Sequence, residues 1–325
     1  MNFEISKNKS LVVLIVLALL ILQSDFLKTY ICEKNVSFIN PSTGCGNRNI
    51  VNKKEYKEFK ERVIKYIKQE QETGELDNIG VWFRDLSAGP TFGINEREDF
   101  VPASLLKLPL ALAFYDLQEE NDNNLLETHL IYTGTTVPVP KQTYRPGTQL
   151  VLSKKYTIKE LIHHSLVYSD NFSSQFLYEY LLKNFNKAEP LLFIYRDMGI
   201  ISSGTSFNQA GINTKGYASI FRQLYNSSLL NPDHSEELLE MLSETNFVLG
   251  LRAGVPPNVR VAHKFGERII ANNDNELHDC GIIYYPDNPY ILCIMTKGKD
   301  LNYLANVVAN VSKMVYEEFN SRGLK

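Results

Sequence analysis

The sequence lacks the patterns that mark several common functional classes. Its six histidines contain no His-x-His or His-x-x-x-His spacing, which argues against a zinc hydrolase, and we expect neither a metal nor a cofactor. The net charge is only -3, and no long basic block is present. Nucleic acid is therefore not expected as a partner. With 44% hydrophobic and 22% charged residues, the composition is typical of a globular protein.

A hydrophobic run of full membrane-spanning length is absent from the N-terminus. Residues 11–22 are uninterruptedly apolar, but twelve residues are short for a spanning helix and typical of a signal-peptide core. Lys7 and Lys9 precede the run, and no clear small-x-small cleavage site follows it. We predict that residues 1–24 are a signal peptide or, slightly favoured, a membrane anchor, followed by an exposed stalk at 25–52. Either alternative places the remaining chain outside the cytoplasm.

Cysteine is scarce, with four residues in the chain. Export permits disulfides, and Cys32 and Cys45, which bracket a short loop, are candidates for one. Cys280 and Cys293 lie in two strand-like runs joined by the turn residues 286–289. With the turn centred there, the two cysteines are diagonal neighbours on one face of the sheet, so we expect buried thiols.

The apolar periodicity predicts two structural units. Helices are expected at 53–72 and 301–319, and strands at 79–86, 91–95, 259–265, 279–285 and 290–296. Between them the pattern is mostly helical, with Thr157 as an expected N-cap, apart from a Thr-, Pro- and Gly-rich loop at 132–153. We therefore expect an α/β (α+β) fold, in which N- and C-terminal helices flank a five-stranded antiparallel sheet and an all-helical domain is inserted. The α/β part spans 53–103 and 250–325, and the helical part spans 104–249.

Ser104 and Lys107 lie three residues apart at the start of an apolar run, 100–115. On a helix they share a face, and the surrounding leucines would desolvate the amine and lower its pKa. A neutral lysine can take the proton of a serine hydroxyl and so activate it as a nucleophile. The alternative is structural: Ser104 as a helix cap and Lys107 as a surface lysine with a buried stem.

Two further motifs follow in order. Ser169-Asp170-Asn171 lies on a predicted loop between helices, and Lys264-Phe265-Gly266 lies at the end of a predicted strand. With Ser-x-x-Lys, this set resembles the penicillin-recognising active-site serine hydrolases, and most closely their class A β-lactamase-like branch. The resemblance covers residues 53–320, including the stretches 156–161 and 251–256, and it implies the two-part fold already derived.

The resemblance also implies roles for individual residues. Ser104 would attack the carbonyl of a β-lactam or of a peptidoglycan stem peptide, and Lys107 would be its base or proton relay. Ser169 would pass a proton to the leaving nitrogen, with Asp170 holding the loop. Asn171, Phe265, Gly266 and Glu267 would contact the substrate, and Lys264 would attract its carboxylate and help to hold Ser169. The backbone amides of Ser104 and Glu267 would form the oxyanion hole.

Two departures from the family pattern bear on function. Phe265 stands where the family prefers Thr or Ser, so a hydroxyl for the substrate carboxylate is missing. Class A β-lactamases activate the deacylating water with a loop glutamate, whereas no Asp or Glu occurs here between Asp197 and Asp233. Asn208 and Gln209 can position a water but cannot act as a base at neutral pH.

Three functions are consistent with these residues. The favoured one is an exported serine β-lactamase of the bacterial cell envelope, a monomer that meets the membrane only through an uncleaved N-terminus. The missing glutamate instead favours a D-Ala-D-Ala carboxypeptidase or transpeptidase. The third is a β-lactam-binding sensor, for which the ten residues before the apolar run leave little room for a signalling region. His263, Arg252 and the adjacent His163 and His164 are interpreted as structural.

Overall fold

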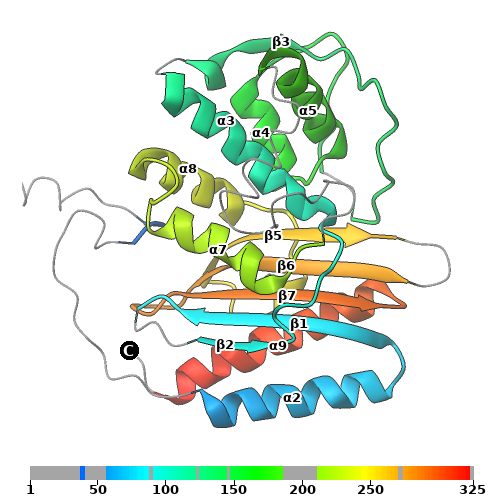
Figure 1. Cartoon of the computed structure of the whole chain (residues 1–325), viewed down its shortest axis with the longest axis vertical. Helices are drawn as coiled ribbons and strands as arrows, with labels where there is room; N and C mark the ends of the chain where they lie inside the picture. Colours follow the sequence, from blue (N-terminus) through cyan, green and yellow to red (C-terminus); the bar gives the residue numbers. More distant parts are fainter. Residues whose placement is uncertain are drawn as a thin grey trace, which may run out of the picture.

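The core of the protein is a five-stranded antiparallel sheet with the strand order β2-β1-β7-β6-β5, shown in Figure 1. The computed structural model describes residues 37–40, 56–87, 91–121, 124–144, 147–185, 211–269 and 274–322. The strands are β1 (Leu76–Asp85), β2 (Thr91–Ile94), β5 (Arg260–Arg268), β6 (Asn275–Tyr284) and β7 (Tyr290–Gly298). The predicted sheet is confirmed, including its assembly from the two ends of the chain.

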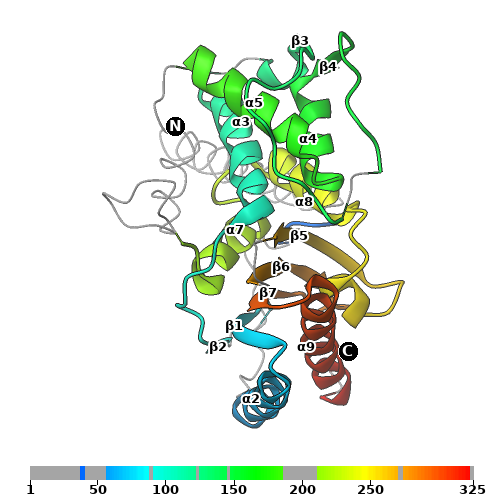
Figure 2. The same ribbon diagram turned by 90° about the vertical axis from the view of Figure 1, so that its right-hand side faces the viewer.

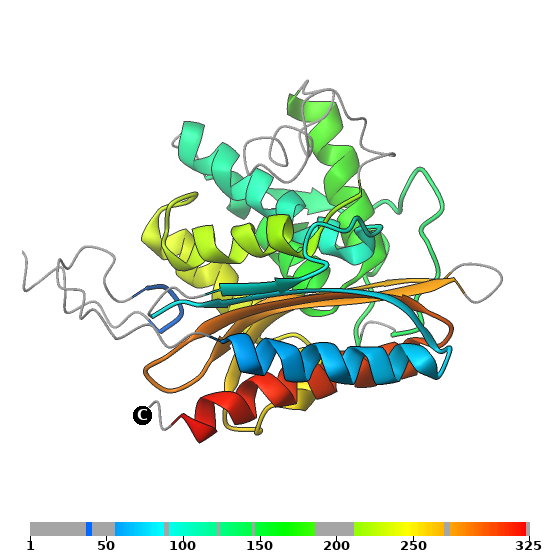
Figure 3. The ribbon, with the colours of Figure 1, turned by 60° about the horizontal axis from the view of Figure 1, so that its bottom comes forward.

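Helices cover both faces of this sheet. The long helices α2 (Lys57–Glu72) and α9 (Leu301–Ser321) lie side by side under one face (Figure 3). Helix α7 (Thr214–Tyr225) packs on the other face against β1, β6 and β7. Because both faces are covered, β6 and β7 are buried along almost their whole length. This explains why these strands are nearly continuous apolar runs rather than alternating ones.

The inserted part stands above the sheet edge formed by β5 (Figure 2). Its helices are α3 (Lys107–Asn121), α4 (Ile158–Val167), α5 (Asn171–Phe185) and α8 (Pro232–Ser243), with short 3-10 turns η1 (Ala103–Leu106), η2 (Leu125–Glu127) and η4 (Gly250–Gly254). The predicted cap of α4 is confirmed, because Thr157 and Glu160 form a reciprocal capping box. The insert also contains a small antiparallel ribbon, β3 (His129–Ile131) with β4 (Lys155–Thr157). The insert is therefore not all-helical, because the residues that flank the predicted 132–153 loop on its two sides pair with each other.

The prediction of buried thiols at Cys280 and Cys293 is wrong, because these residues form a disulfide. They face each other directly across β6 and β7, in register with the pair Ile283 and Tyr290. That register centres the turn between residues 286 and 287, one position earlier than the sequence suggested. A shift of one residue in the turn moves the two cysteines from diagonal to opposite positions.

The segment 37–40 is docked on the domain rather than exposed. Phe38 and Ile39 are buried, and Phe38 packs edge-on against Tyr284 while Arg260 lies over its ring. The carboxylate of Glu236 accepts the backbone N–H groups of residues 37, 38 and 39 at 2.5–3.0 Å. The predicted exposed stalk is thus wrong at Phe38 and Ile39, whose apolar side chains are buried.

Replacing Glu236 by Ala should lower the free energy of unfolding by about 1–3 kcal/mol, because backbone N–H groups lose a charged acceptor. Urea denaturation measures the change, and limited proteolysis should become faster near residue 40. Glu240→Ala is the control, since Glu240 is exposed on the same helix. Equal stability of the two variants would contradict the docking role of Glu236.

Several predictions lie outside the described residues: the segment 1–24, the pairing of Cys32 with Cys45, and Asn208 and Gln209. Among the residues that the structure describes, no helix has the length and apolar character needed to cross a membrane. The division into parts at 104 and 249 remains a prediction.

Candidate active site

Ser104 lies in a tight turn that connects the sheet to the insert. Val101 precedes a proline, and this disfavours helical backbone before Pro102. Ala103 has a φ of 48°, a left-handed conformation that costs roughly 1–3 kcal/mol and persists only where neighbours enforce it. The turn closes with a hydrogen bond from Leu105 N to Pro102 O at 3.0 Å. Ser104 follows in η1, directly before α3 begins at Lys107.

Lys107 is turned inward from the first turn of α3 and is only 5% exposed. Its Nζ donates to Asn171 Oδ1 at 2.6 Å and to Ser169 Oγ at 3.2 Å, and also to the Ser169 carbonyl. Burial and the nearby charge of Lys264 lower the pKa of Lys107 well below its usual value. Lys107 is therefore a buried amine with a lowered pKa, as predicted, and the surface-lysine alternative is wrong.

The Ser-Asp-Asn loop presents side chains to Lys107 from the start of α5. Ser169 is fully buried with a φ of 52°, so its backbone is strained as well. Asp170 accepts the N–H groups of Phe172 at 3.1 Å and Ser173 at 3.1 Å. This confirms its predicted structural role, as it caps the first turn of α5.

Lys264 reaches the same point from β5. It is fully buried, and its Nζ donates to Ser169 Oγ at 2.9 Å. Burial lowers the pKa of Lys264 to about 7, although the charges of Asp279 and Glu267 partly oppose this shift. Ser169 thus lies between two amines, and its hydroxyl accepts a hydrogen bond from both.

 

Side chains alternate along a strand, so the residues next to Lys264 on β5 start from the opposite face of the sheet. Phe265, which follows Lys264, packs in the hydrophobic cluster that α9 covers and stacks on Phe247 with ring centroids 4.0 Å apart, while Lys264 Nζ lies 4.5 Å from the centroid of the Phe265 ring. Gly266 approaches the nucleophile turn so closely that a Cβ there would lie 3.2 Å from Leu105 N and from Pro102 O. A glycine at this position therefore lets β5 pack directly against the turn that carries Ser104.

Glu267 has a role that its position in the sequence did not reveal. Its carboxylate accepts the backbone N–H groups of Thr143 and Tyr144 at 3.0–3.1 Å. It thereby fastens the middle of the 132–153 loop to the last residues of β5. The contact joins residues more than 120 positions apart, so no local pattern could have indicated it. The predicted use of the Glu267 backbone amide in an oxyanion hole remains a prediction.

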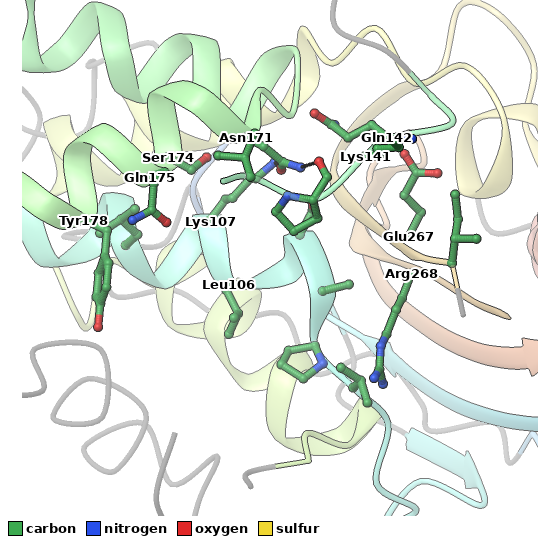
Figure 4. Close-up of a pocket in the computed structure, with 18 of the residues that line it drawn as sticks. Leu106, Lys107, Lys141, Gln142, Asn171, Ser174, Gln175, Tyr178, Glu267 and Arg268 are labelled. Atoms are coloured by element: carbon green, nitrogen blue, oxygen red, sulfur yellow. Dashed lines mark hydrogen bonds between the residues drawn. The ribbon is translucent and has the colours of Figure 1, made fainter. Parts of the chain in front are cut away.

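These elements enclose a cavity of about 860 Å³, shown in Figure 4. Its described lining includes Ser104, Lys107, Asn171 and Glu267, together with Gln142, whose side-chain amide donates to Ser169 O at 2.8 Å. Ser169 and Lys264 are not among the lining residues, but Ser169 Oγ accepts hydrogen bonds from both Lys107 and Lys264. Phe265 and Gly266 are not among the lining residues, so their predicted contact with substrate is not seen in this geometry. Gln142 was missed because it lies in a loop without periodicity.

The arrangement has the parts of a nucleophilic active site. A serine on a strained turn shares a cavity with a buried amine whose pKa is lowered, and a second serine links that amine to another lysine. Such a set can move a proton away from the nucleophile and deliver one to a leaving group. Within the described ranges, no three His, Cys, Asp or Glu side chains come together as ligands for a metal.

Comparison with known proteins gives this site a family context. The sequence profile described as "Beta-lactamase enzyme family" matches residues 59–319. A β-lactamase of Bacteroides uniformis is 25% identical over 263 residues, which cover 74% of this chain and 84% of that protein. A β-lactamase of Bacillus licheniformis is 26% identical over 261 residues, covering 75% and 80% of the two chains.

Solved structures share the fold at lower sequence identity. PBP-A superposes with a TM-score of 0.68 at 18% identity, covering 84% of this chain and all of that one (100%). The extended-spectrum β-lactamase TLA-1 gives a TM-score of 0.68 at 17% identity, covering 81% of this chain and 99% of that one. The family match spans most of the chain and includes all three motifs. The chain therefore belongs to the β-lactamase enzyme family and is a serine β-lactamase-like hydrolase.

Proposed function

We propose that this protein hydrolyses β-lactams through an acyl-enzyme on Ser104, as a class A-like enzyme with slow deacylation. The observation that carries the proposal is the buried Lys107 amine, which shares the cavity with Ser104 and contacts Ser169 and Asn171. A solved structure of a PBP-A variant is an acyl-enzyme complex with penicillin G, so this fold accommodates such an intermediate.

Acylation follows from the positions of the side chains. Lys107 takes the proton of the Ser104 hydroxyl as the oxygen attacks the lactam carbonyl. Ser169, in contact with Lys107 and Lys264, passes a proton to the lactam nitrogen when the carbon–nitrogen bond breaks. The product is an ester on Ser104, with the proton count unchanged. Asn171 holds Lys107 and presents its amide at the wall of the cavity.

Deacylation is the slow step in this proposal. Hydrolysis of the ester needs a base for the attacking water, and no carboxylate occurs between Asp197 and Asp233. Glu267 also lines the cavity, but its carboxylate accepts the N–H groups of Thr143 and Tyr144. Lys107, whose pKa is lowered by burial, is therefore the base that this proposal assigns to deacylation. We therefore expect turnover well below the rate of acylation.

The acylation rate should show a bell-shaped dependence on pH. Acidification protonates Lys107, whose pKa is lowered by burial, and a charged amine cannot accept the serine proton. Above about pH 7, Lys264 loses its proton and with it the attraction for an anionic substrate. Stopped-flow acylation over pH 5–10 measures the profile, and a rate that climbs steadily above pH 7 would contradict it.

A D-Ala-D-Ala carboxypeptidase or transpeptidase is the second candidate. The absent loop carboxylate favours it, because such enzymes are expected to be trapped by β-lactams. The two functions are separated by incubating the protein with a chromogenic cephalosporin and with a peptidoglycan stem peptide ending in D-Ala-D-Ala. Catalytic opening of the lactam supports the proposed function. Release of D-alanine combined with a permanent β-lactam adduct supports the peptidase, and a permanent adduct without D-alanine release supports a sensor.

We also propose that the protein is exported and acts in the cell envelope. The support is the lysine-flanked apolar run at 11–22. Fractionation of cells that express the full chain, with mass analysis of its N-terminus, tests the proposal. Cytoplasmic protein with an intact N-terminus would contradict it.

A further inference from the structure

The peptide of Val101, three residues before Ser104, is held by two side chains from the neighbouring sheet. Val101 N donates to Glu276 Oε2 at 2.9 Å. His278 Nε2 lies 2.9 Å from Val101 O and 3.2 Å from Glu276 Oε2. Both polar groups of one backbone residue outside any regular element are thus satisfied by β6.

The hydrogen-bond partners define the tautomer of His278. Thr296 N donates to His278 Nδ1 at 3.3 Å, so Nδ1 carries a lone pair. Nε2 faces two oxygen atoms and therefore carries the proton. His278 is fully buried, and Glu276 is 5% exposed, so water does not compete effectively for these contacts.

The held segment is short and strained. Val101 is followed by Pro102 and then by Ala103, whose φ is 48°. A left-handed alanine relaxes unless its surroundings fix it. On the C-terminal side of the turn, Tyr217 OH from α7 donates to Leu105 O at 2.8 Å. On its other side, Phe100 exchanges two backbone hydrogen bonds with Ile212 at 2.8 and 2.9 Å. Glu276 and His278 supply the sheet-side anchor.

We propose that Glu276 and His278 are positioning residues, which hold the Val101 peptide so that the strained turn presents Ser104 to Lys107. Neither residue lines the cavity among the described residues, so they act through the backbone. The inference rests on the proposed function of Ser104 as the nucleophile. It adds a pair from β6 that none of the three sequence motifs contains.

The test is the kinetics of acylation by a penicillin in the full chain. His278→Leu removes the hydrogen bonds that the ring makes with Val101 O and with Thr296 N, with little change in volume. It should slow the acylation step by about 10- to 100-fold, because small displacements of a nucleophile cost rates of this order. The dissociation constant of the non-covalent complex should change less than about threefold. His278→Gln, which retains a donor near the Nε2 position, should restore the rate to within about fivefold of the wild type. A purely structural role would affect stability without this rescue.

Val308→Ala is the control for general destabilisation. Val308 is buried on α9, on the opposite face of the sheet, and its variant should acylate within about twofold of the wild-type rate. Wild-type-like acylation by a folded His278→Leu variant would overturn the inference. If that variant does not fold, Glu276→Leu is the second variant, with an expected loss of about tenfold, and an unchanged rate would again overturn the inference.

Hydrogen exchange at the Val101 amide tests the anchor independently. The amide should exchange only on global unfolding, since its acceptor is a buried carboxylate. Exchange at the rate of an exposed loop would overturn the inference even if neither variant folds. A wild-type protein that forms no adduct would refute the proposed function, whereas protection of Val101 would still be expected from the anchor.

Discussion

Lys107→Met should slow acylation by a penicillin by a factor of about 10²–10⁴, the contribution usual for a positioned general base. Methionine fills a similar volume but cannot accept the proton of Ser104. Burial lowers the pKa of Lys107, so the wild-type amine is poised as a base, and the loss is therefore chemical as well as steric. Single-turnover kinetics with a fluorescent penicillin measure the rate.

Lys141→Met is the matched control for this prediction. Lys141 also lines the cavity, but its side chain is exposed, so the same substitution removes a positive charge without removing the buried base. Its acylation rate should change by at most a few-fold. If both variants slow acylation equally, the cavity needs positive charge in general, and Lys107 is not the base.

Ser169→Ala should slow acylation by about 10²-fold. Its hydroxyl lies 3.2 Å from Lys107 Nζ and 2.9 Å from Lys264 Nζ, so its removal breaks the route by which a proton reaches the leaving nitrogen. The carbonyl of residue 169 still accepts from Lys107, and Lys107 therefore keeps its place. The same single-turnover assay measures the loss.

Ser153→Ala is the control, because Ser153 shares the left-handed backbone with a φ of 65° but is exposed on a loop. Both variants place alanine in a conformation that disfavours it, so both should lose some stability. Only Ser169→Ala should lose acylation. A parallel loss in both variants would assign the effect to backbone strain.

Local signals in the sequence predicted much of the fold. Thr157 and Glu160 form the capping box that a Thr-x-x-Glu pattern favours. The apolar runs before and after 286–289 predicted β6 and β7, although their register was displaced. The register depends on which residues occupy the turn, and a displacement of one residue is enough to bring Cys280 opposite Cys293.

The catalytic motifs were also visible, since each is contiguous in the chain, but the contacts that hold them were not. Glu267 binds the backbone at Thr143 and Tyr144, and Glu276 binds that of Val101. Both contacts join distant segments through backbone atoms, which carry no residue-specific signal. Strand alternation places Phe265 on the opposite face of β5 from Lys264. Which of the two faces α9 covers could not be read from the sequence.

The lack of a loop carboxylate is what makes it hard to choose between the proposed hydrolase and a peptidase that β-lactams inactivate. In the proposed mechanism acylation depends on Ser104, Lys107, Ser169 and Lys264. Hydrogen bonds join the last three, and Ser104 lines the same cavity as Lys107. Hydrolysis of the ester depends on a water-activating base, and the family's usual glutamate has no counterpart between Asp197 and Asp233. The proposed function therefore predicts that the acyl-enzyme forms faster than it is hydrolysed.

The most direct test is the intact mass of the protein over time after addition of a penicillin, with Ser104→Ala in parallel. We expect a mass increase of one penicillin, located on Ser104 by peptide mapping, that forms quickly and decays slowly as hydrolysed product accumulates. The Ser104→Ala variant should remain unmodified. A wild-type protein that gains no mass, or an adduct that persists in Ser104→Ala, would contradict the assignment of Ser104 as the nucleophile.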